Sequence, residues 1–574
     1  MLKLMRYLRP YQILIVLVLT LILFQSLSEL YLPTLMADII DKGVVNQDTP
    51  YIWKIGGLML LVAALGTICS IAASYYSAKV SMSFGKDLRH KVFSHVENFT
   101  LQEFDRFGTA SLITRTTNDI TQVQQVVNMV LRMMVTAPIM AIGGMIMAYS
   151  QDAELSKIFL VAIPVLFAVI LLVVWKGIPL FKLVQVRLDQ VNRVLRENLT
   201  GIRVIRSFNR IVYEKNRFQH ANADLTETSI KVNKIMALLM PVLMLIMNYT
   251  VISIIWFGAL QIDEGNMQVG GLMAFIQYAM QIMFSMIMLS MMFVMIPRAS
   301  ASAVRINEVL QTQPVIQETS HSIVAQKKGY LEFRHVTFSY PGAEVPALRN
   351  LSFQVKPGET TAIIGGTGSG KSSLLKLIPR FYEIDSGSIL IDGIDIKDMT
   401  LEKLREKIGL VPQKAVLFTG TIKENLLFGN ENSSDEEFIH ALKIAQAYDF
   451  VSKLDKGLDS TISQGGTNLS GGQKQRLSIA RALVRRPEIY LFDDSFSALD
   501  YKTDAMLRKA LKQVTENAAL LVVAQRVSTV MDADQIIVLD EGNVAGIGTH
   551  KELMKTCGVY QEIVSSQATE EELA

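Results

Sequence analysis

A glycine-rich segment at 365–372, GGTGSGKS, has the residue types and spacing of a phosphate-binding loop, G-x-x-x-x-G-K-[ST]. The apolar residues 361–364 predict a buried strand before it, and the residues after Ser372 predict a helix. Glycines let backbone N–H groups approach phosphate oxygens, while Lys371 reaches the terminal phosphates and Ser372 binds Mg²⁺. The candidate loop residues are Gly365, Gly366, Thr367, Gly368, Ser369, Gly370, Lys371, Ser372 and Ser373.

Two further features follow this loop along the chain. The apolar run 489–492 ends at Asp493, and a buried strand that ends in a carboxylate completes Mg²⁺ coordination in phosphate-loop enzymes. Apolar strands ending in Asp are common, so this feature alone is weak. Between the two lies an LSGGQ stretch formed by Leu469, Ser470, Gly471, Gly472 and Gln473. The order of phosphate loop, Gln413, LSGGQ, acid-ended strand and the SALD residues 497–500 resembles the ATP-binding-cassette (ABC) family.

The resemblance implies roles for several residues. In that family an aromatic residue after the first strand stacks on adenine, here Tyr340, and Gln413 contacts Mg²⁺ and reports the nucleotide state to the membrane helices. The LSGGQ stretch opens a helix, so its N–H groups and Ser470 hold the γ-phosphate of ATP bound to a facing subunit. Two such domains must meet head to tail, and one chain supplies one domain. The resemblance therefore implies a dimer that binds ATP and Mg²⁺.

The chain departs from the family pattern at two catalytic positions. The family has a Glu after the acid-ended strand to polarise the attacking water, whereas this chain has Asp494, whose side chain is one methylene shorter. A misplacement of roughly 1 Å can lower a rate about a hundredfold. The family's switch His, expected after the strand at 520–524, is replaced by Gln525. Glutamine donates hydrogen bonds to phosphate but carries no positive charge.

Two substitutions beside an intact LSGGQ stretch resemble the degenerate-site subunit of heterodimeric bacterial multidrug exporters. In that interpretation, the chain's own site holds ATP and hydrolyses it slowly, while residues 470–473 complete the active site of a different partner subunit. A homodimer that tolerates both substitutions is the alternative, because Asp can still act as a weak base.

The composition predicts a membrane domain followed by an α/β domain. Hydrophobic residues make up 50% of the 574 residues and charged residues only 19%, and the long apolar runs lie in the first three hundred or so residues. Six runs have the length and apolarity of membrane spans, at 12–33, 54–77, 129–149, 157–178, 236–261 and 272–296. Six spans before the ATP-binding domain resemble the exporter branch of the family. The fold class expected is an all-α six-helix transmembrane domain followed by an α/β phosphate-loop nucleotide-binding domain.

The basic residues predict the orientation of these spans. Lys and Arg gather before the first span and in the segments 79–115 and 182–217, whereas the loops 38–48, 151–154 and 263–266 are short and acidic. Basic flanks stay in the cytoplasm, so both termini are expected there. The half-size design and the lack of a recognisable targeting segment indicate a bacterial cytoplasmic membrane.

The two basic segments keep helical spacing, which predicts that paired membrane helices continue beyond the bilayer. Aromatic and charged residues at their turns suit docking on the ATPase domain, although solvated turns are the simpler alternative. These docking candidates are Phe104, Arg106, Phe107, Phe208 and Arg210.

The sixth span holds eight methionines between 273 and 295, and methionine repacks around apolar partners of different shape. Filler that faces lipid is the alternative for any one of them. Polar groups within spans are costly against lipid and are expected to face the bundle. Glu29 is one of these, although its place near the outer end fits an interfacial role equally well. The candidates for a substrate cavity are Gln25, Asn248, Gln277, Gln281 and Met283.

The expected domains are a transmembrane domain at 1–310, a linker at 311–329, a nucleotide-binding domain at 330–566 and an acidic tail at 567–574. In the first strand of the nucleotide-binding domain, near 331–338, apolar alternation changes register at His335.

The function expected first is ATP-driven efflux of hydrophobic compounds by a heterodimer with a different half-transporter. Export of lipid or lipopeptide is the alternative within this class, and an ATP-gated, non-hydrolysing sensor or channel is the alternative from another class. A net charge of +3 without a Lys/Arg block excludes nucleic acid as the expected partner. The two cysteines lie in different domains, and the seven histidines lack zinc-ligand spacing.

Overall fold

The computed structural model describes residues 2–316 and 328–567, without the side chains of Leu2, Val174 and 290–294. Most of the expected linker and the tail 568–574 therefore lie outside the described residues. The chain divides into two compact units. The first contains Met1–Glu97 and Thr109–Thr312, and the second contains Asn98–Gly108 and Gln313–Ala574. The expected transmembrane domain included 98–108, whereas the structure groups this segment with the second unit.

Six long helices form the first unit, and six helices are long and apolar enough to cross a membrane, which confirms the expected number. They are α2 (Gln12–Asp38), α3 (Thr49–Glu97), α6 (Ile120–Gln151), α7 (Ile158–Thr200), α9 (Ile211–Asp263) and α10 (Val269–Gln311). A helix of about 20 residues crosses a bilayer, whereas α3 has 49 residues and α9 has 53. The long helices therefore continue well beyond the length that a membrane needs.

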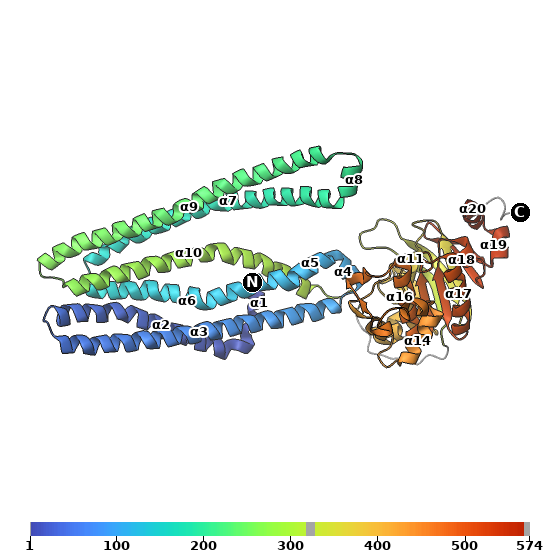
Figure 1. Cartoon of the computed structure of the whole chain (residues 1–574), viewed down its shortest axis with the longest axis horizontal. Helices are drawn as coiled ribbons and strands as arrows, with labels where there is room; N and C mark the ends of the chain where they lie inside the picture. Colours follow the sequence, from blue (N-terminus) through green and yellow to red (C-terminus); the bar gives the residue numbers. More distant parts are fainter. Residues whose placement is uncertain (1, 317–327, 568–574) are drawn as a thin grey trace. The chain divides into compact units, whose positions relative to one another are not determined.

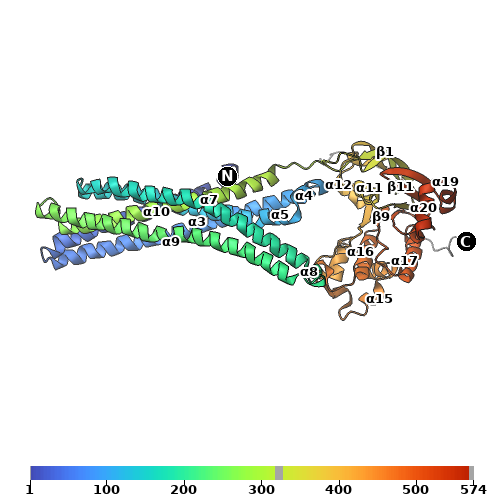
Figure 2. The same cartoon turned by 90° about the horizontal axis from the view of Figure 1, so that it is seen from above.

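Short elements join and extend these helices: α1 (Leu2–Met5), η1 (Arg6–Tyr11), η2 (Ile39–Val44), α5 (Thr109–Thr114), η3 (Arg115–Asp119), η4 (Leu155–Lys157) and α8 (Ile202–Ser207). Figures 1 and 2 show that α7 and α9 run side by side, joined by α8. In Figure 1 this green pair diverges from α2, α3, α6 and α10 toward α8.

The second unit contains a four-stranded antiparallel sheet in the order β2-β1-β4-β5 and a six-stranded sheet in the order β12-β11-β3-β10-β9-β6. The larger sheet is parallel apart from its antiparallel edge strand β12. The strands are β1 (Leu331–Phe338), β2 (Leu348–Val355), β3 (Thr360–Gly365), β4 (Ser386–Ile391), β5 (Ile394–Asp395), β6 (Ile408–Val411), β9 (Ile489–Asp493), β10 (Ala519–Val523), β11 (Gln535–Asp540) and β12 (Asn543–Gly548), with β7 (Gly420–Thr421) and β8 (Thr461–Ile462) paired apart.

The helices of the second unit are α4 (Leu101–Phe107), α11 (Lys371–Leu377), α12 (Leu401–Glu406), α13 (Ile422–Leu427), α14 (Asp435–Ile444), α15 (Tyr448–Val451), α16 (Gly471–Arg485), α17 (Tyr501–Val514), α18 (Val527–Val530), α19 (His550–Thr556) and α20 (Gly558–Gln567). Short 3₁₀ turns η5 (Ile396–Asp398), η6 (Gly457–Asp459) and η7 (Gln464–Gly466) lie between them.

Both faces of the larger sheet are buried, as expected for a parallel sheet. On β9, Tyr490 and Phe492 pack into a core with α14, α16 and α17, while Ile489 and Leu491 pack into a second core with β1, β2 and β4. The expected register change in β1 is confirmed: pairing shifts between Phe333 and Val336, and His335 has a φ of 48°. The unit therefore has three layers, with the smaller sheet and the helices on opposite faces of the larger one.

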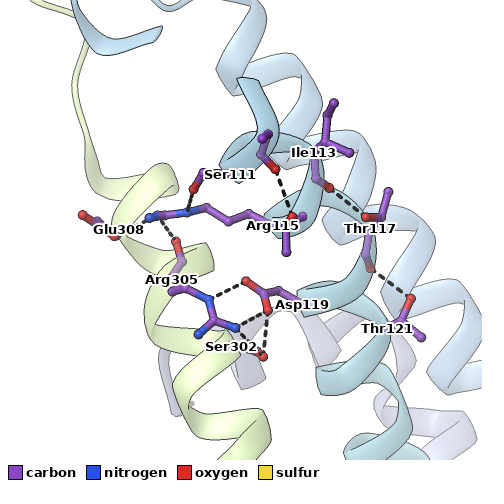
Figure 3. Close-up of polar contacts among 11 residues, drawn as sticks. Ser111, Ile113, Arg115, Thr117, Asp119, Thr121, Ser302, Arg305 and Glu308 are labelled. Carbon is purple, nitrogen blue, oxygen red and sulfur yellow. Dashed lines mark hydrogen bonds and ion pairs between the residues drawn. The ribbon is translucent and has the colours of Figure 1, made fainter. Parts of the chain in front are cut away.

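A polar network centred on the buried Asp119 joins the π-helical turn η3 to α10 within the first unit (Figure 3). The Asp119 carboxylate accepts hydrogen bonds from Ser302 Oγ at 2.9 Å and from Arg305 Nε at 2.7 Å, and from a second guanidinium nitrogen of Arg305. Beside it, Arg115 donates to Glu308 and to the Arg305 backbone oxygen, both at 2.8 Å. Every contact in this network requires η3 and α10 to keep their register.

We expect Asp119→Ala to lower the stability of the purified protein, because it leaves a buried hydroxyl and a guanidinium without their acceptor. The Asp119 side chain is 3% exposed and that of Arg305 is 46% exposed, so water replaces part of the lost interaction and the cost is about 1–3 kcal/mol. Glu308→Ala is the matched control, since this carboxylate is 44% exposed and its loss costs about 0–1 kcal/mol. Thermal unfolding in detergent measures the stability of both variants. Equal decreases in unfolding temperature for Asp119→Ala and Glu308→Ala would contradict the structural role of Asp119.

Candidate functional site

The phosphate loop lies between β3 and α11, as the strand and helix flanks predicted. Lys371 Nζ donates to the backbone oxygens of Gly365 at 2.8 Å and Gly366 at 2.7 Å, so its ammonium group lies over the loop. Gly370 has a φ of 98° at the start of α11, a left-handed conformation that glycine adopts without strain. The loop thus presents the N-terminus of α11 and a lysine to the same point, which suits a phosphate group.

Two consecutive aspartates, the last residue of the inner strand β9 and the residue after it, receive hydrogen bonds from three other segments. Ser372 Oγ donates to Asp493 Oδ1 at 2.9 Å. Gln413, which follows β6, donates to Asp494 Oδ2 at 3.3 Å, and Gln525, which follows β10, donates to the same oxygen at 2.9 Å. The structure thus brings together five residues that the sequence had placed in one site.

Burial disfavours the charged forms of the two aspartates and of Lys371 in this site. Burial raises the pKa of Asp493, aided by the charge of Asp494, and burial also raises the pKa of Asp494. Burial lowers the pKa of Lys371 against the opposing effect of both carboxylates. Asp493, Ser372 and Gln413 supply the oxygen ligands that Mg²⁺ prefers. A divalent cation would offset the cost of burying both carboxylates, so these residues fit Mg²⁺ bound together with a nucleotide.

Tyr340 follows β1 and lies beside the loop. Its hydroxyl is 2.9 Å from Ser373 Oγ, and its ring makes an edge contact with Tyr382 at a centroid distance of 5.4 Å. Since the ring is only partly buried, it retains surface on which a base could stack. The expected role in adenine binding agrees with this position and stays a prediction.

The LSGGQ stretch forms the N-terminal cap of α16. Ser470 Oγ accepts from the Gln473 backbone N–H at 3.3 Å, and the Gln473 side chain accepts from the Ser470 N–H at 2.8 Å, which is a capping box. Ser470 and Gly471 are exposed, whereas Leu469, Gly472 and Gln473 are partly buried. The N-terminus of this 15-residue helix therefore faces outward with its positive dipole end accessible.

The segment 98–108 packs within the second unit through contacts that sequence reasoning missed. Tyr382 donates to Asp105 Oδ2 at 2.8 Å, Leu101 packs against the core of β1, β2 and β4, and Glu103 accepts from the Val315 N–H at 3.1 Å. Burial, and then the bond to Asp105, raises the pKa of Tyr382, so the phenol stays a donor. The T-x-x-E spacing of Thr100 and Glu103, a capping box, was the available signal for α4.

Among the docking candidates in this segment, Phe107 is buried, Phe104 is partly buried and Arg106 is exposed. In the first unit, Phe208 is 74% exposed and Arg210 is exposed, at the end of α8.

The candidates for a substrate cavity differ in exposure. Gln277 and Asn248 are exposed, while Gln25 and Gln281 are partly buried. Met283 is 2% exposed and packs with Leu166, Ile170 and Leu243 between α7, α9 and α10. Its side chain fills a core in this structure, so Met283 is not available to line a cavity.

Adding a methyl group at Gly365 is expected to disrupt the loop. A Cβ there would lie 2.2 Å from the Leu539 backbone oxygen and 2.6 Å from Ser369 Oγ, whereas a Cβ on Gly366 meets nothing within 4 Å. Gly365→Ala should therefore cost about 1–3 kcal/mol and weaken nucleotide binding, while Gly366→Ala keeps the wild-type stability. Thermal unfolding and binding of a fluorescent ATP analogue test this, and equal stability of the two variants would contradict it.

Tyr382→Phe is expected to loosen α4 on the second unit by removing the bond to Asp105. A hydrogen bond worth about 0.5–1.5 kcal/mol corresponds to roughly two- to tenfold faster amide exchange in 98–108. Tyr560→Phe is the matched control, because that buried phenol bonds to His550 at 2.7 Å instead. Hydrogen exchange measured by mass spectrometry distinguishes them, and unchanged protection of 98–108 in Tyr382→Phe would refute the contact.

Comparisons with known proteins agree with this geometry. The family model for the ABC transporter transmembrane region matches residues 15–286, and the family model described as ABC transporter matches residues 348–497. The chain is 43% identical to the uncharacterized ABC transporter ATP-binding protein YfiB of Bacillus subtilis, covering 98% of each chain. It is 31% identical to an ATP-dependent lipid A-core flippase of Chromobacterium violaceum, over 95% of this chain and 93% of that one.

Among solved structures, an ATP-bound bacterial Atm1-family ABC exporter aligns with a TM-score of 0.81 and 25% identity, over 97% of this chain and 98% of that one. The match spans the six-helix unit and the phosphate-loop unit in the same order. The chain therefore belongs to the ABC transporter family and has the fold of its exporters.

Proposed function

We propose that this chain is one subunit of a heterodimeric, ATP-driven exporter and contributes a degenerate ATP site. The observation that carries the proposal is the hydrogen bonding of Asp494, whose carboxylate accepts from two neutral amides, Gln413 and Gln525. The water-polarising position thus holds a short carboxylate, and the switch position holds a side chain that cannot become cationic.

This chemistry supports ATP binding more than ATP hydrolysis. A general base must lie within hydrogen-bond reach of the water it activates, and Asp494 extends one methylene less than a glutamate would. Gln525 can hold a phosphate oxygen but cannot supply positive charge to a developing one. The loop with Lys371 and Ser372 keeps every group that binding needs. A site that holds ATP while a second site hydrolyses it is the expected result.

The second site would use the exposed cap of α16. Head-to-tail assembly places Ser470 and the following N–H groups of this chain on the γ-phosphate bound to the partner. The partner would supply its own phosphate loop, catalytic glutamate and switch histidine. Closure of the two domains on ATP would act on the membrane helices through α4 and through the turn near Phe208. Both termini would lie in the cytoplasm of a bacterial cell.

The proposed cargo is a hydrophobic compound. Its recognition would involve partly exposed polar groups of the helices, among them Gln25, Asn248, Gln277 and Gln281. Lipid export is the second candidate, favoured by the similarity to a lipid A-core flippase. A homodimer remains the alternative assembly, and a non-hydrolysing sensor is the alternative function, although the intact signature cap argues against a sensor.

The test is ATPase turnover of the chain alone and of the chain assembled with a candidate partner half-transporter that carries the catalytic glutamate and the switch histidine. We expect slow turnover alone, an increase of about tenfold or more with Asp494→Glu, and rapid turnover in the pair. Brisk turnover by the unmodified chain alone would replace the heterodimer with a homodimer. Absence of turnover in every assembly, together with an ATP-induced conformational change, would favour the sensor.

A matched pair of variants in the signature cap isolates the composite site. A Cβ on Gly471 meets nothing within 4 Å, so Gly471→Ala should fold. Gly471→Asp should fold too, since a carboxylate is favourable in the first turn of a helix, yet it repels the partner's phosphate. In the pair, we expect Gly471→Asp to abolish turnover and Gly471→Ala to retain much of it. Full activity of Gly471→Asp would exclude this cap from the active site.

A further inference from the structure

Helix α2 carries a carboxylate without a cationic partner. Glu29 is partly buried, and its Oε1 accepts one hydrogen bond, at 3.0 Å, from Gln25 on the same helix. None of the ion pairs within the described residues involves Glu29. A carboxylate in an apolar helix is costly unless it is paired, and such residues mark functional sites in membrane proteins. The chain therefore leaves a charge for another molecule to match.

Glu29 points away from the apolar surface of its helix. At 3.6 residues per turn, positions two residues apart lie about 160° apart around the axis. Leu27 and Tyr31 flank Glu29 at this spacing, and both are exposed apolar side chains, at 51% and 44%. On the side of Glu29, the helix buries Ser26 and Pro33 instead. Lipid suits the face of Leu27 and Tyr31, so Glu29 faces the interior of the bundle.

Helix α10 contributes a further acceptor, on a side chain that contacts the backbone of Glu29. Gln281 Nε2 donates to the Glu29 backbone oxygen at 3.3 Å, whereas Gln281 Oε1 is buried and has no hydrogen-bond partner. The hydroxyl of Ser26, one turn before Glu29 and Leu30, is likewise buried without a partner. A buried acceptor without a donor costs about 1–3 kcal/mol. A hydroxyl can donate as well as accept, so the imbalance rests on Gln281 Oε1, which lacks a donor, and on the Glu29 carboxylate, which lacks a cation.

An apolar surface adjoins these acceptors on α10. Met273, Gln277, Met280 and Phe284 recur at spacings of three and four residues and are all exposed, so they share one face of the helix. Gln281 lies one turn after Gln277. Thioether and aromatic side chains adapt to apolar molecules of different shapes. The site thus offers an acceptor cluster at one end and an adaptable apolar surface beside it.

We infer that Glu29 and Gln281 form a binding site for the protonated amine of an amphipathic molecule whose apolar body lies along Met273, Met280 and Phe284. This inference rests on the proposed export function and names its substrate class. An ammonium group supplies both the positive charge that Glu29 lacks and the N–H donors that Gln281 Oε1 lacks. Either a soluble amphipathic amine or the headgroup of an amine-bearing lipid has this chemistry.

Binding of three fluorescent probes without ATP tests the site. The purified dimer in phosphatidylcholine nanodiscs is titrated with dansylcadaverine, its N-acetyl derivative and its trimethylammonium derivative. We expect the primary amine to bind at least tenfold more tightly than the neutral acetyl probe, with the trimethylammonium probe between them because it lacks N–H donors. Equal affinities for the amine and acetyl probes would overturn the inference.

The variants Glu29→Gln and Glu264→Gln separate the site from general effects of charge. We expect Glu29→Gln to lower the affinity for the primary amine about tenfold and to leave the affinity for the acetyl probe nearly unchanged. Glu264→Gln, in the exposed turn between α9 and α10, should change the affinity for neither probe. An equal loss for both probes in Glu29→Gln would indicate packing rather than recognition and would refute the site. Because the binding assay contains no ATP, its result does not depend on whether the chain belongs to an ATP-driven exporter.

Nanodiscs that also contain phosphatidylethanolamine distinguish the two sources of the amine. Competition between this lipid and dansylcadaverine, lost in Glu29→Gln, would support the site and identify a lipid headgroup as its ligand. Unchanged probe binding would support the site with a soluble amphipathic amine as the ligand. Competition that persists in Glu29→Gln would place the ligand elsewhere and contradict the inference.

Discussion

The nucleotide site depends on the burial of two adjacent carboxylates at the end of β9. Asp493 is the last of the five residues of β9, all of which are buried, and Asp494 follows it. Ionised carboxylates at such a position require donors or a cation, because desolvation favours their neutral forms. The donors come from α11, from the end of β6 and from the end of β10. These segments are far apart in the chain. They reach the two aspartates only because the parallel sheet places β6, β9, β10 and β3 next to one another.

The same arrangement shows how the end of β9 is held with an aspartate at 494 and a glutamine at 525. Asp494 has a φ of 47°, a left-handed conformation that is uncommon for residues other than glycine. Its backbone N–H donates to the Val523 oxygen at 2.9 Å, which fixes the strand end independently of the side chain. An amide at Gln525 satisfies the carboxylate as well as an imidazole N–H would. The fold therefore accommodates Asp494 and Gln525, and in the proposed function these residues would alter hydrolysis rather than folding.

Features that depend on local sequence could be predicted, whereas those that depend on distant contacts could not. The loop at 365–372, the strand ending at Asp493 and the bulge at His335 each follow from neighbouring residues, and so do the six spans. The position of 98–108 depends on Tyr382 and Val315, which lie more than 200 residues away. No spacing rule connects them. Met283 resembled its neighbours on the sixth span, and only the packing of α7 and α9 against it shows that its side chain is buried.

Two acidic residues in the first unit differ in whether the protein supplies a cationic partner for the carboxylate. Asp119 accepts hydrogen bonds from both a hydroxyl and a guanidinium, so its charge is matched within the protein and holds η3 against α10. Glu29 receives a single neutral donor and lies beside an acceptor that has none. Matching charges within a protein stabilises one arrangement of its helices. An unmatched carboxylate destabilises the empty protein, and a cationic ligand that relieves this cost gains affinity from it.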